Sequence, residues 1–193
     1  MTSPQSIAVA KYLAERFGGR GEVFEYGQDE GDLRVHVLEC ANTPSQGLTS
    51  YGTVGMSEFD NQLVTAEGSP LRVELVSAGG EGWGFVAQAL ATCAFNVGGG
   101  EYRCKPGTVF PSVFEGYETP VTTPHAFMWY PFFWEAEFSG LVFENVQIEF
   151  LQVVPITDAE MEYVRDFGAE ALVDRLEAVS DRELSSLDRS SVA

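Results

Sequence analysis

Two histidines and three cysteines are the side chains of this 193-residue sequence with the widest range of chemistry. A structural zinc site usually takes two close pairs of ligands, and His36 with Cys40 is the one close pair. His125 lies far from that pair, and Cys93 and Cys104 form no CxxC motif. We therefore predict no metal site and no cofactor.

Carboxylate pairs are the next candidates, because two carboxyl groups can serve as acid and base. Glu135 and Glu137 are such a pair, but with 29 acids in the chain such spacings arise by chance. The glycine clusters at 79–82 and 98–100 lack the spacing of phosphate-binding loops, and no GxSxG nucleophile motif occurs. His125 is expected at a loop or strand edge rather than as a general base. The sequence does not indicate an enzyme.

The composition excludes further classes of function. Against 29 Asp and Glu stand 11 Lys and Arg, so the net charge is −18. Nucleic acids and anionic membranes attract basic proteins, so neither is an expected partner. No stretch approaches the roughly 20 apolar residues of a membrane span, and Lys11 interrupts the N-terminal apolar residues, unlike a signal peptide. Widely spaced cysteines without an export signal predict a cytoplasmic protein with reduced thiols.

One segment combines acidity with aromatic rings. Residues 106–155 hold six acids, no Lys or Arg, and 12 of the 24 aromatic residues. The simplest interpretation is a core strand pair with outward-facing Glu side chains, because aromatics dominate cores. Yet the rings within 129–134 are nearly consecutive, and neighbouring strand residues point to opposite faces. Some rings must therefore lie under a second layer or in an exposed patch, and an exposed aromatic patch flanked by acids is typical of a protein-binding surface. The residues predicted to form it are Glu115, Tyr117, Glu118, Trp129, Tyr130, Trp134, Glu135 and Glu137.

Local patterns predict the elements that position these side chains. Ser3-Pro4 begins a helix that ends at Gly18, and Thr157-Asp-Ala-Glu160 is a capping box that opens the C-terminal helices. Alternating apolar residues predict strands at 33–37, 71–75 and 146–154, the last stopped by Pro155, and a central helix spans 83–95. The prediction is one α+β or α/β sandwich domain over residues 1–193, structured over about 7–180, with a frayed tail at 181–193. A mixed β-sheet is flanked by N-terminal, central and C-terminal helices.

Four stretches resemble the suppressor of fused family. The segment 48–57 is similar to the family's Thr-x-Gly-Met-Ser turn after a strand, here Thr53 to Ser57. The segment 72–75 resembles its next strand, with an inward-facing Glu at position 74. The helix at 85–91 and the strand-to-helix segment 150–160 complete the likeness, which spans about residues 7 to 180.

The resemblance implies an α/β sandwich and a role in protein binding. Small stand-alone members look like bacterial immunity proteins that neutralise a toxin, whereas the animal member grips an extended peptide between two domains. We therefore expect an immunity or inhibitor protein, a monomer or weak homodimer, that binds a basic toxin or regulatory protein through the acidic aromatic surface. The alternative is a regulatory scaffold that captures an extended peptide by β-strand addition.

Overall fold

The structure, a computed structural model, describes residues 3–28, 31–80, 83–117 and 120–193. Within these residues nine strands form one mixed sheet, accompanied by five α-helices and one 3₁₀ turn. The elements in chain order are α1 (Pro4–Phe17), β1 (Glu22–Gly27), β2 (Arg34–Ala41), β3 (Leu48–Val54), η1 (Met56–Glu58), β4 (Leu63–Val64), β5 (Pro70–Gly80), α2 (Val86–Gly98), β6 (Val109–Phe110), β7 (His125–Trp129), β8 (Leu141–Phe143), β9 (Val146–Ile156), α3 (Asp158–Phe167), α4 (Ala169–Leu176) and α5 (Asp181–Leu184). The predicted single α+β domain with a mixed sheet is confirmed.

The sheet is organised around its two longest strands. Its order is β1-β2-β3-β5-β9-β7-β6, with β4 added beside β5 and β8 beside β9. The neighbouring β5 and β9 are parallel, and the other pairings are antiparallel. Because β5 and β9 each span eleven residues and are mostly buried, they carry the centre of the core.

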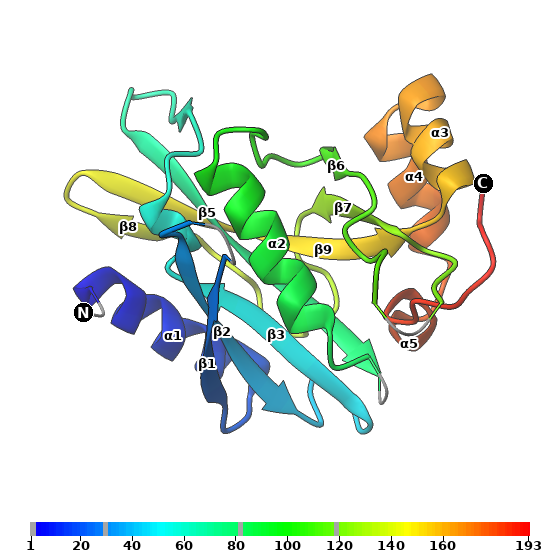
Figure 1. Ribbon diagram of the computed structural model, residues 1–193, viewed down its shortest axis with the longest axis horizontal. Helices are drawn as coiled ribbons and strands as arrows, with labels where there is room; N and C mark the ends of the chain where they lie inside the picture. Colours follow the sequence, from blue (N-terminus) through cyan, green and yellow to red (C-terminus); the bar gives the residue numbers. More distant parts are fainter. Residues whose placement is uncertain (1–2, 29–30, 81–82, 118–119) are drawn as a thin grey trace.

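Helices cover both faces of the sheet (Figure 1). On one face α2 packs through Leu90, Cys93 and Ala94 against strand residues such as Leu75. On the other face α1 and α4 form a second apolar cluster, together with aromatic residues from the segment between β7 and β8. The aromatic segment thus supplies part of a covering layer.

The N-terminal helix begins and ends where the sequence predicts. The Ser3 hydroxyl accepts the N–H of Ser6 as an N-cap, and Gly18 ends the helix in the left-handed conformation. Both Ser3 and Ser6 donate their hydroxyls to the Glu58 carboxylate at 2.7 and 2.8 Å. These bonds tie α1 to the turn that follows β3.

The junction between β9 and α3 confirms one prediction and corrects another. Thr157 and Glu160 form both hydrogen bonds of the predicted capping box. Pro155, however, does not stop the strand, because β9 continues to Ile156 and pairs Pro155 with Ala126 of β7. Proline lacks only the N–H donor, so its carbonyl can still accept a hydrogen bond. The Arg189 guanidinium donates to this carbonyl at 2.8 Å.

The predicted frayed tail at 181–193 is wrong, because this segment packs onto the domain. Leu184 and Leu187 are fully buried, and Arg189 is 7% exposed. The guanidinium of Arg189 forms a bidentate ion pair with Glu160, Nη1 to Oε1 at 2.6 Å and Nη2 to Oε2 at 2.8 Å. Local sequence gave no sign of this contact, because its two partners are 29 positions apart.

We expect Arg189→Ala to lower the free energy of unfolding by about 3 kcal/mol or more, because it leaves the Glu160 carboxylate buried without its cation. The matched control is Arg165→Ala, which removes an exposed arginine paired only with its neighbour Asp166 and should cost less than about 1 kcal/mol. Urea denaturation measures both. Equal effects of the two substitutions would show that the tail is not held by this ion pair.

Candidate partner-binding groove

The residues predicted to form one binding surface occupy three separate places in the structure. Trp134, Glu135 and Glu137 lie in the segment behind α1, and Tyr117 lies near the start of α2. Trp129 and Tyr130 lie at the end of β7, in a groove beside α3 and α4. Exposed Glu115 is close to Tyr117 in the chain, and Glu118 falls outside the described residues.

Trp134 is a core residue rather than a surface anchor. Its side chain is 8% exposed, its ring stacks on Phe17 with centroids 5.3 Å apart, and its indole N–H donates to Ser50 Oγ at 2.9 Å. Glu135 and Glu137 are exposed in a stretch without helix or strand. The glutamates, and not the indole, are therefore available to a partner.

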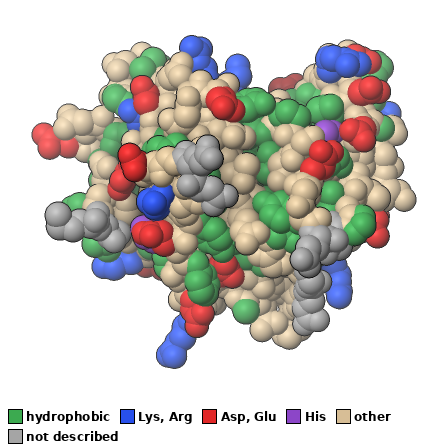
Figure 2. All heavy atoms as spheres, viewed as in Figure 1, with side chains coloured by type: hydrophobic (Ala, Val, Ile, Leu, Met, Phe, Trp, Pro, Cys, Tyr) green, Lys and Arg blue, Asp and Glu red, His purple; other side chains and the backbone are tan. Residues whose placement is uncertain are grey.

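The strongest candidate surface surrounds Tyr130. Two adjoining cavities share Pro106 and Tyr130 in their walls. The first, of about 360 Å³, is mainly apolar and lies over β5 and β9, with Leu71, Val73 and Leu151 in its wall. The second, of about 460 Å³, runs between Tyr130 and the turn from α3 to α4. We call the two together the aromatic groove, and Figure 2 shows the outline hollowed between the lobe of α3 and α4 and the rest of the molecule.

Two exposed rings rim the aromatic groove, and each is backed by another ring. Tyr130 is 60% exposed and packs edge-on against Trp129, which stacks on the buried Phe127. Phe167 is 67% exposed and lies against Tyr163 with centroids 4.6 Å apart. Backed rings lose little conformational freedom on binding, which favours tight contact.

Backbone contacts hold the groove in shape. Gln152 of β9 accepts the N–H groups of Phe132 and Phe133 at 2.9 and 3.3 Å, so the chain after Tyr130 is anchored to the central strand. On the opposite wall Gly107 has a φ of +85°, and a Cβ there would lie 2.9 Å from Ala169 Cβ. Only glycine lets this loop approach α4 so closely.

The charge around the groove is mixed. Glu149 and Glu170 line it, but so does Lys105, which precedes the acidic segment in the sequence and is brought beside Tyr130 by the fold. Acidic side chains on the face shown in Figure 2 are dispersed rather than gathered in one patch. On this face the charge segregation along the sequence does not produce one acidic patch.

The histidines and cysteines occupy structural positions. His125 is 3% exposed; its Nδ1 accepts the N–H of Ser112 at 3.0 Å, so its Nε2 carries the proton donated to Asp158 at 2.9 Å. With both nitrogens bonded, the ring has no lone pair for a substrate. His36 and Cys40 stand four positions apart on one strand, roughly 13 Å, which is too far for a shared ion.

The cysteines are buried, and burial raises the pKa of the Cys104 thiol to about 12. Among the described residues no group of three or more His, Cys, Asp or Glu side chains is placed to hold a metal ion. None of the helices formed by the described residues is long and apolar enough to cross a membrane.

The carboxyl group of Glu74 has a strongly raised pKa and is fully buried. Burial raises its pKa from 4.5 to about 7, although hydrogen bonds to the carboxylate oppose the shift. It accepts the Thr53 hydroxyl at 2.6 Å and the N–H groups of Gly55 and Ser57 at 2.9 and 3.1 Å. Glu74 thus holds the Thr53–Ser57 turn, in which Gly55 adopts a φ of +101°. A carboxyl group with no access to solvent cannot serve a substrate.

The turn held by Glu74 and the strand-to-helix junction at Glu160 lie in three of the four stretches, 48–57, 72–75 and 150–160, that resemble a known family. The family model for suppressor of fused protein matches residues 31–190. The chain belongs to the suppressor of fused family.

The chain is similar in sequence to a bacterial protein and in fold to several proteins of known structure. The chain is 30% identical over 174 residues, 90% of both chains, to the immunity protein YqcF of Bacillus subtilis strain 168. The structure of a suppressor of fused homologue from Neisseria gonorrhoeae FA 1090 matches with a TM-score of 0.69 and 14% identity, covering 98% of this chain and 97% of that one.

A crystal structure of a Sufu–Fu complex gives the same TM-score and identity, over all of this chain and 93% of that one. Drosophila suppressor of fused matches at 0.67 and 14% identity, and the 98% of this chain that aligns spans about half of that protein, 51%. These structures share the fold with this chain.

Trp129 and Tyr130, which the sequence predicts as partner-binding residues, line the groove, whereas the residues of its opposite rim were not predicted. Phe167 is the missed residue with a local signal, because it follows the charged Arg165 and Asp166 and directly precedes the helix-ending Gly168. Pro106, Glu149 and Glu170 gave no local signal, since each belongs to the groove only through the packing of distant segments.

We expect Glu74→Gln to change the pH dependence of stability. In the wild type the unfolded chain releases the Glu74 proton near pH 4.5 and the folded chain near pH 7, so folding stability falls as pH rises through this window. The Gln variant lacks this loss. Its free energy of unfolding relative to that of the wild type should therefore rise by about 3 kcal/mol as the pH is raised from 5 to 8. Urea denaturation of both proteins at several pH values measures the difference. A difference that stays constant with pH would contradict the raised pKa.

Proposed function

We propose that this protein is a non-enzymatic binding module, an immunity-type protein that binds and neutralises a partner protein. Its relative YqcF, which covers the same length, is named an immunity protein. A structurally similar chain occurs in a Sufu–Fu complex, which is an assembly between proteins. Both relatives support a role in binding.

The observation that carries the proposal is the aromatic groove. Exposed Tyr and Phe rings, fixed by rings behind them and adjoining an apolar cavity, are the arrangement found at the energetic centres of protein interfaces. Tyr130 and Phe167 face this groove from two elements that the chain brings together. A partner would insert an apolar side chain beside Tyr130.

The net charge supports a basic partner. At −18 the protein would attract a basic chain over several ångströms and speed its association. Glu115, Glu135 and Glu137 are exposed and lie outside the groove, so we assign them to steering rather than to central contacts. Three buried thiols are compatible with the reducing cytoplasm, where we propose that the protein acts as a monomer or weak homodimer.

We expect Tyr130→Ala and Phe167→Ala each to weaken binding of the partner about tenfold or more. A suitable partner to test is a toxin encoded by a neighbouring reading frame, with affinity measured by calorimetry and protection measured as growth on co-expression. The matched control is Val142→Ala, since Val142 is 78% exposed and lies outside the groove. Unchanged affinity in both groove variants would refute this surface.

Charge variants complete that experiment. Changing Glu115, Glu135 and Glu137 to Gln should slow association at low salt and leave the dissociation rate nearly unchanged. Association rates that do not respond to these changes or to salt would remove the basic partner from the proposal while leaving the groove intact.

A second candidate function, capture of an extended peptide by strand addition, is favoured by strand β1. This strand is one edge of the sheet, and five of its six residues are exposed, including Val23 and Phe24 on opposite faces. The N–H of Gln28 bonds to the carbonyl of Leu33, which sets the alternation of hydrogen bonds along β1 and β2. By this alternation Val23, Glu25 and Gly27 direct their backbone groups away from β2, towards an incoming strand.

We expect Val23→Pro to abolish binding by strand addition, because it removes an outward N–H without breaking a bond to β2. Val23→Thr is the control, since it keeps the N–H and the β-branched shape. Partner affinity of both variants is measured as for Tyr130→Ala, with circular dichroism to verify folding. Equal affinities of the two Val23 variants would rule out this edge and leave the aromatic groove as the binding surface.

A further inference from the structure

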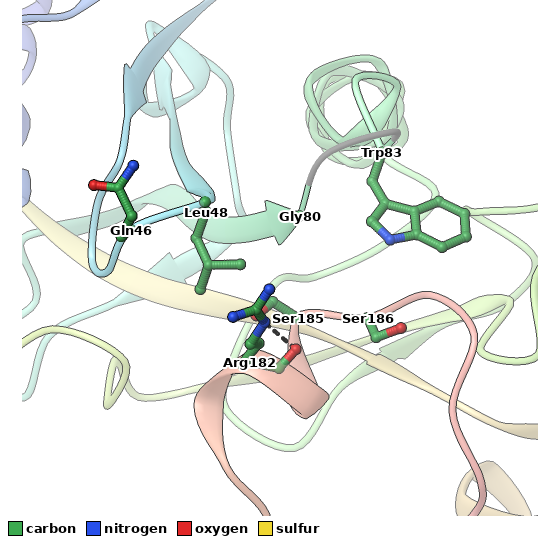
Figure 3. Close-up of a pocket in the computed structure, with 8 residues that line it drawn as sticks. Gln46, Leu48, Gly80, Trp83, Arg182, Ser185 and Ser186 are labelled. Carbon is green, nitrogen blue, oxygen red and sulfur yellow. Dashed lines mark hydrogen bonds between the residues drawn. The ribbon is translucent and has the colours of Figure 1, made fainter.

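A separate cavity lies at the opposite end of β5 from the aromatic groove. It measures about 490 Å³, is open to solvent, and is lined by the turn before β3, the end of β5, the segment before α2 and the region of α5 (Figure 3). The aromatic groove includes Leu71 near the start of β5, and this cavity includes Gly80 at its end. The groove residue Leu151 pairs with Leu75, five positions before Gly80, so the two linings lie roughly 17 Å apart along the strand and the two sites can be tested independently.

The cavity has an apolar side and a donor-rich side. Leu48 is 3% exposed and Trp83 contributes its ring, while Arg182 contributes the one formal charge among the described lining residues. Figure 3 shows Trp83 on one side of the space and Leu48 with Arg182 on the other. The Trp83 indole N–H is bonded to no acceptor within the described residues. Two donors, one of them cationic, therefore border a space whose lining is partly polar and partly apolar.

The walls of the cavity are held by contacts of their own. The N–H of Trp83 bonds to the carbonyl of Gly80 at 3.2 Å, and its ring packs edge-on against Phe85 with centroids 5.8 Å apart. On the other wall Leu184 is fully buried and Ser185 is nearly so, which fixes the short helix carrying Arg182. The described parts of both walls are therefore held in place before any ligand arrives.

We propose that this cavity binds an apolar residue that carries a free carboxylate, as found at the C-terminal end of a polypeptide or in a small N-acyl amino acid. The apolar side chain would lie between Leu48 and the Trp83 ring. The carboxylate would accept hydrogen bonds from the Arg182 guanidinium and the Trp83 indole N–H, since charge-assisted bonds to guanidinium are strong and directional. In a protein of net charge −18 an anion needs such a local cation to bind.

The size of the cavity agrees with this class of ligand. Small-molecule sites usually measure about 300–1,000 Å³. The cavity, at about 490 Å³, falls within that range and can hold a single acylated leucine. The site lies apart from the aromatic groove and the β1 edge, so it does not depend on the proposed function.

The experiment follows the indole N–H resonance of Trp83 in ¹⁵N-labelled protein, assigned with Trp83→Phe. The probes are N-acetyl-leucine, the tripeptide acetyl-Ala-Ala-Leu with a free C-terminus, and the same tripeptide as its C-terminal amide. The indole resonances of Trp129 and Trp134 serve as internal references. Arg182→Gln tests the cation, and Arg165→Gln is its control on a different helix.

We expect saturable movement of the Trp83 resonance with dissociation constants in the millimolar range, as its few atoms allow. The C-terminal amide and Arg182→Gln should each weaken binding about tenfold or more, whereas Arg165→Gln should leave it unchanged. A tripeptide acid that binds more tightly than N-acetyl-leucine assigns the site to polypeptide ends, and equal affinities assign it to small acids. Equal binding of acid and amide, unchanged affinity in Arg182→Gln, or a Trp83 resonance that does not move would overturn the proposal.

Discussion

The fold on the C-terminal side depends on one buried carboxylate, Glu160. It closes the capping box of α3 through the N–H of Thr157, binds the guanidinium of Arg189, and accepts the N–H of Val192 at 3.0 Å. The junction between β9 and α3 and the C-terminal tail therefore meet at a single side chain. Because α3 starts from this point at the end of β9, its far end places Phe167 across from Tyr130. The second wall of the aromatic groove thus belongs to a helix whose first turn is capped by this carboxylate.

Glu74 shows what the same residue type does without a cation. Both carboxylates are fully buried and both organise a turn, but Glu74 is satisfied by a hydroxyl and backbone N–H groups alone. Its pKa is accordingly raised, because desolvation outweighs the hydrogen bonds. The two glutamates fasten opposite ends of the sandwich: one secures the turn after β3 and hence α1, and the other secures α3 and the tail. Such rigid support suits a protein whose candidate sites lie on its surface.

Much of the fold was predictable wherever neighbouring residues determine the structure. Ser3 and Gly18 bound α1, Thr157 and Glu160 open α3, and alternation marks the central strands, because caps and periodicity act over a few residues. The candidate site was predictable only in part. Tyr130 was found because consecutive rings cannot all face one core. Phe167 was missed because its exposure depends on how α3 leaves the sheet.

The sequence by itself determined the capped helices and the longest strands, the mixed α and β character, the excess of acid and the concentration of rings in one segment. These properties depend on composition or on the pattern of neighbouring residues, so they can be read without knowledge of the tertiary structure. Only the tertiary structure decided which rings are buried, as Trp134 is by Ser50 and Phe17, and which stay exposed. It also decided that Lys105 lies beside Tyr130 and that Arg189 returns to Glu160. Those outcomes follow from contacts between residues far apart in the chain, whose geometry is set by packing of the whole sheet.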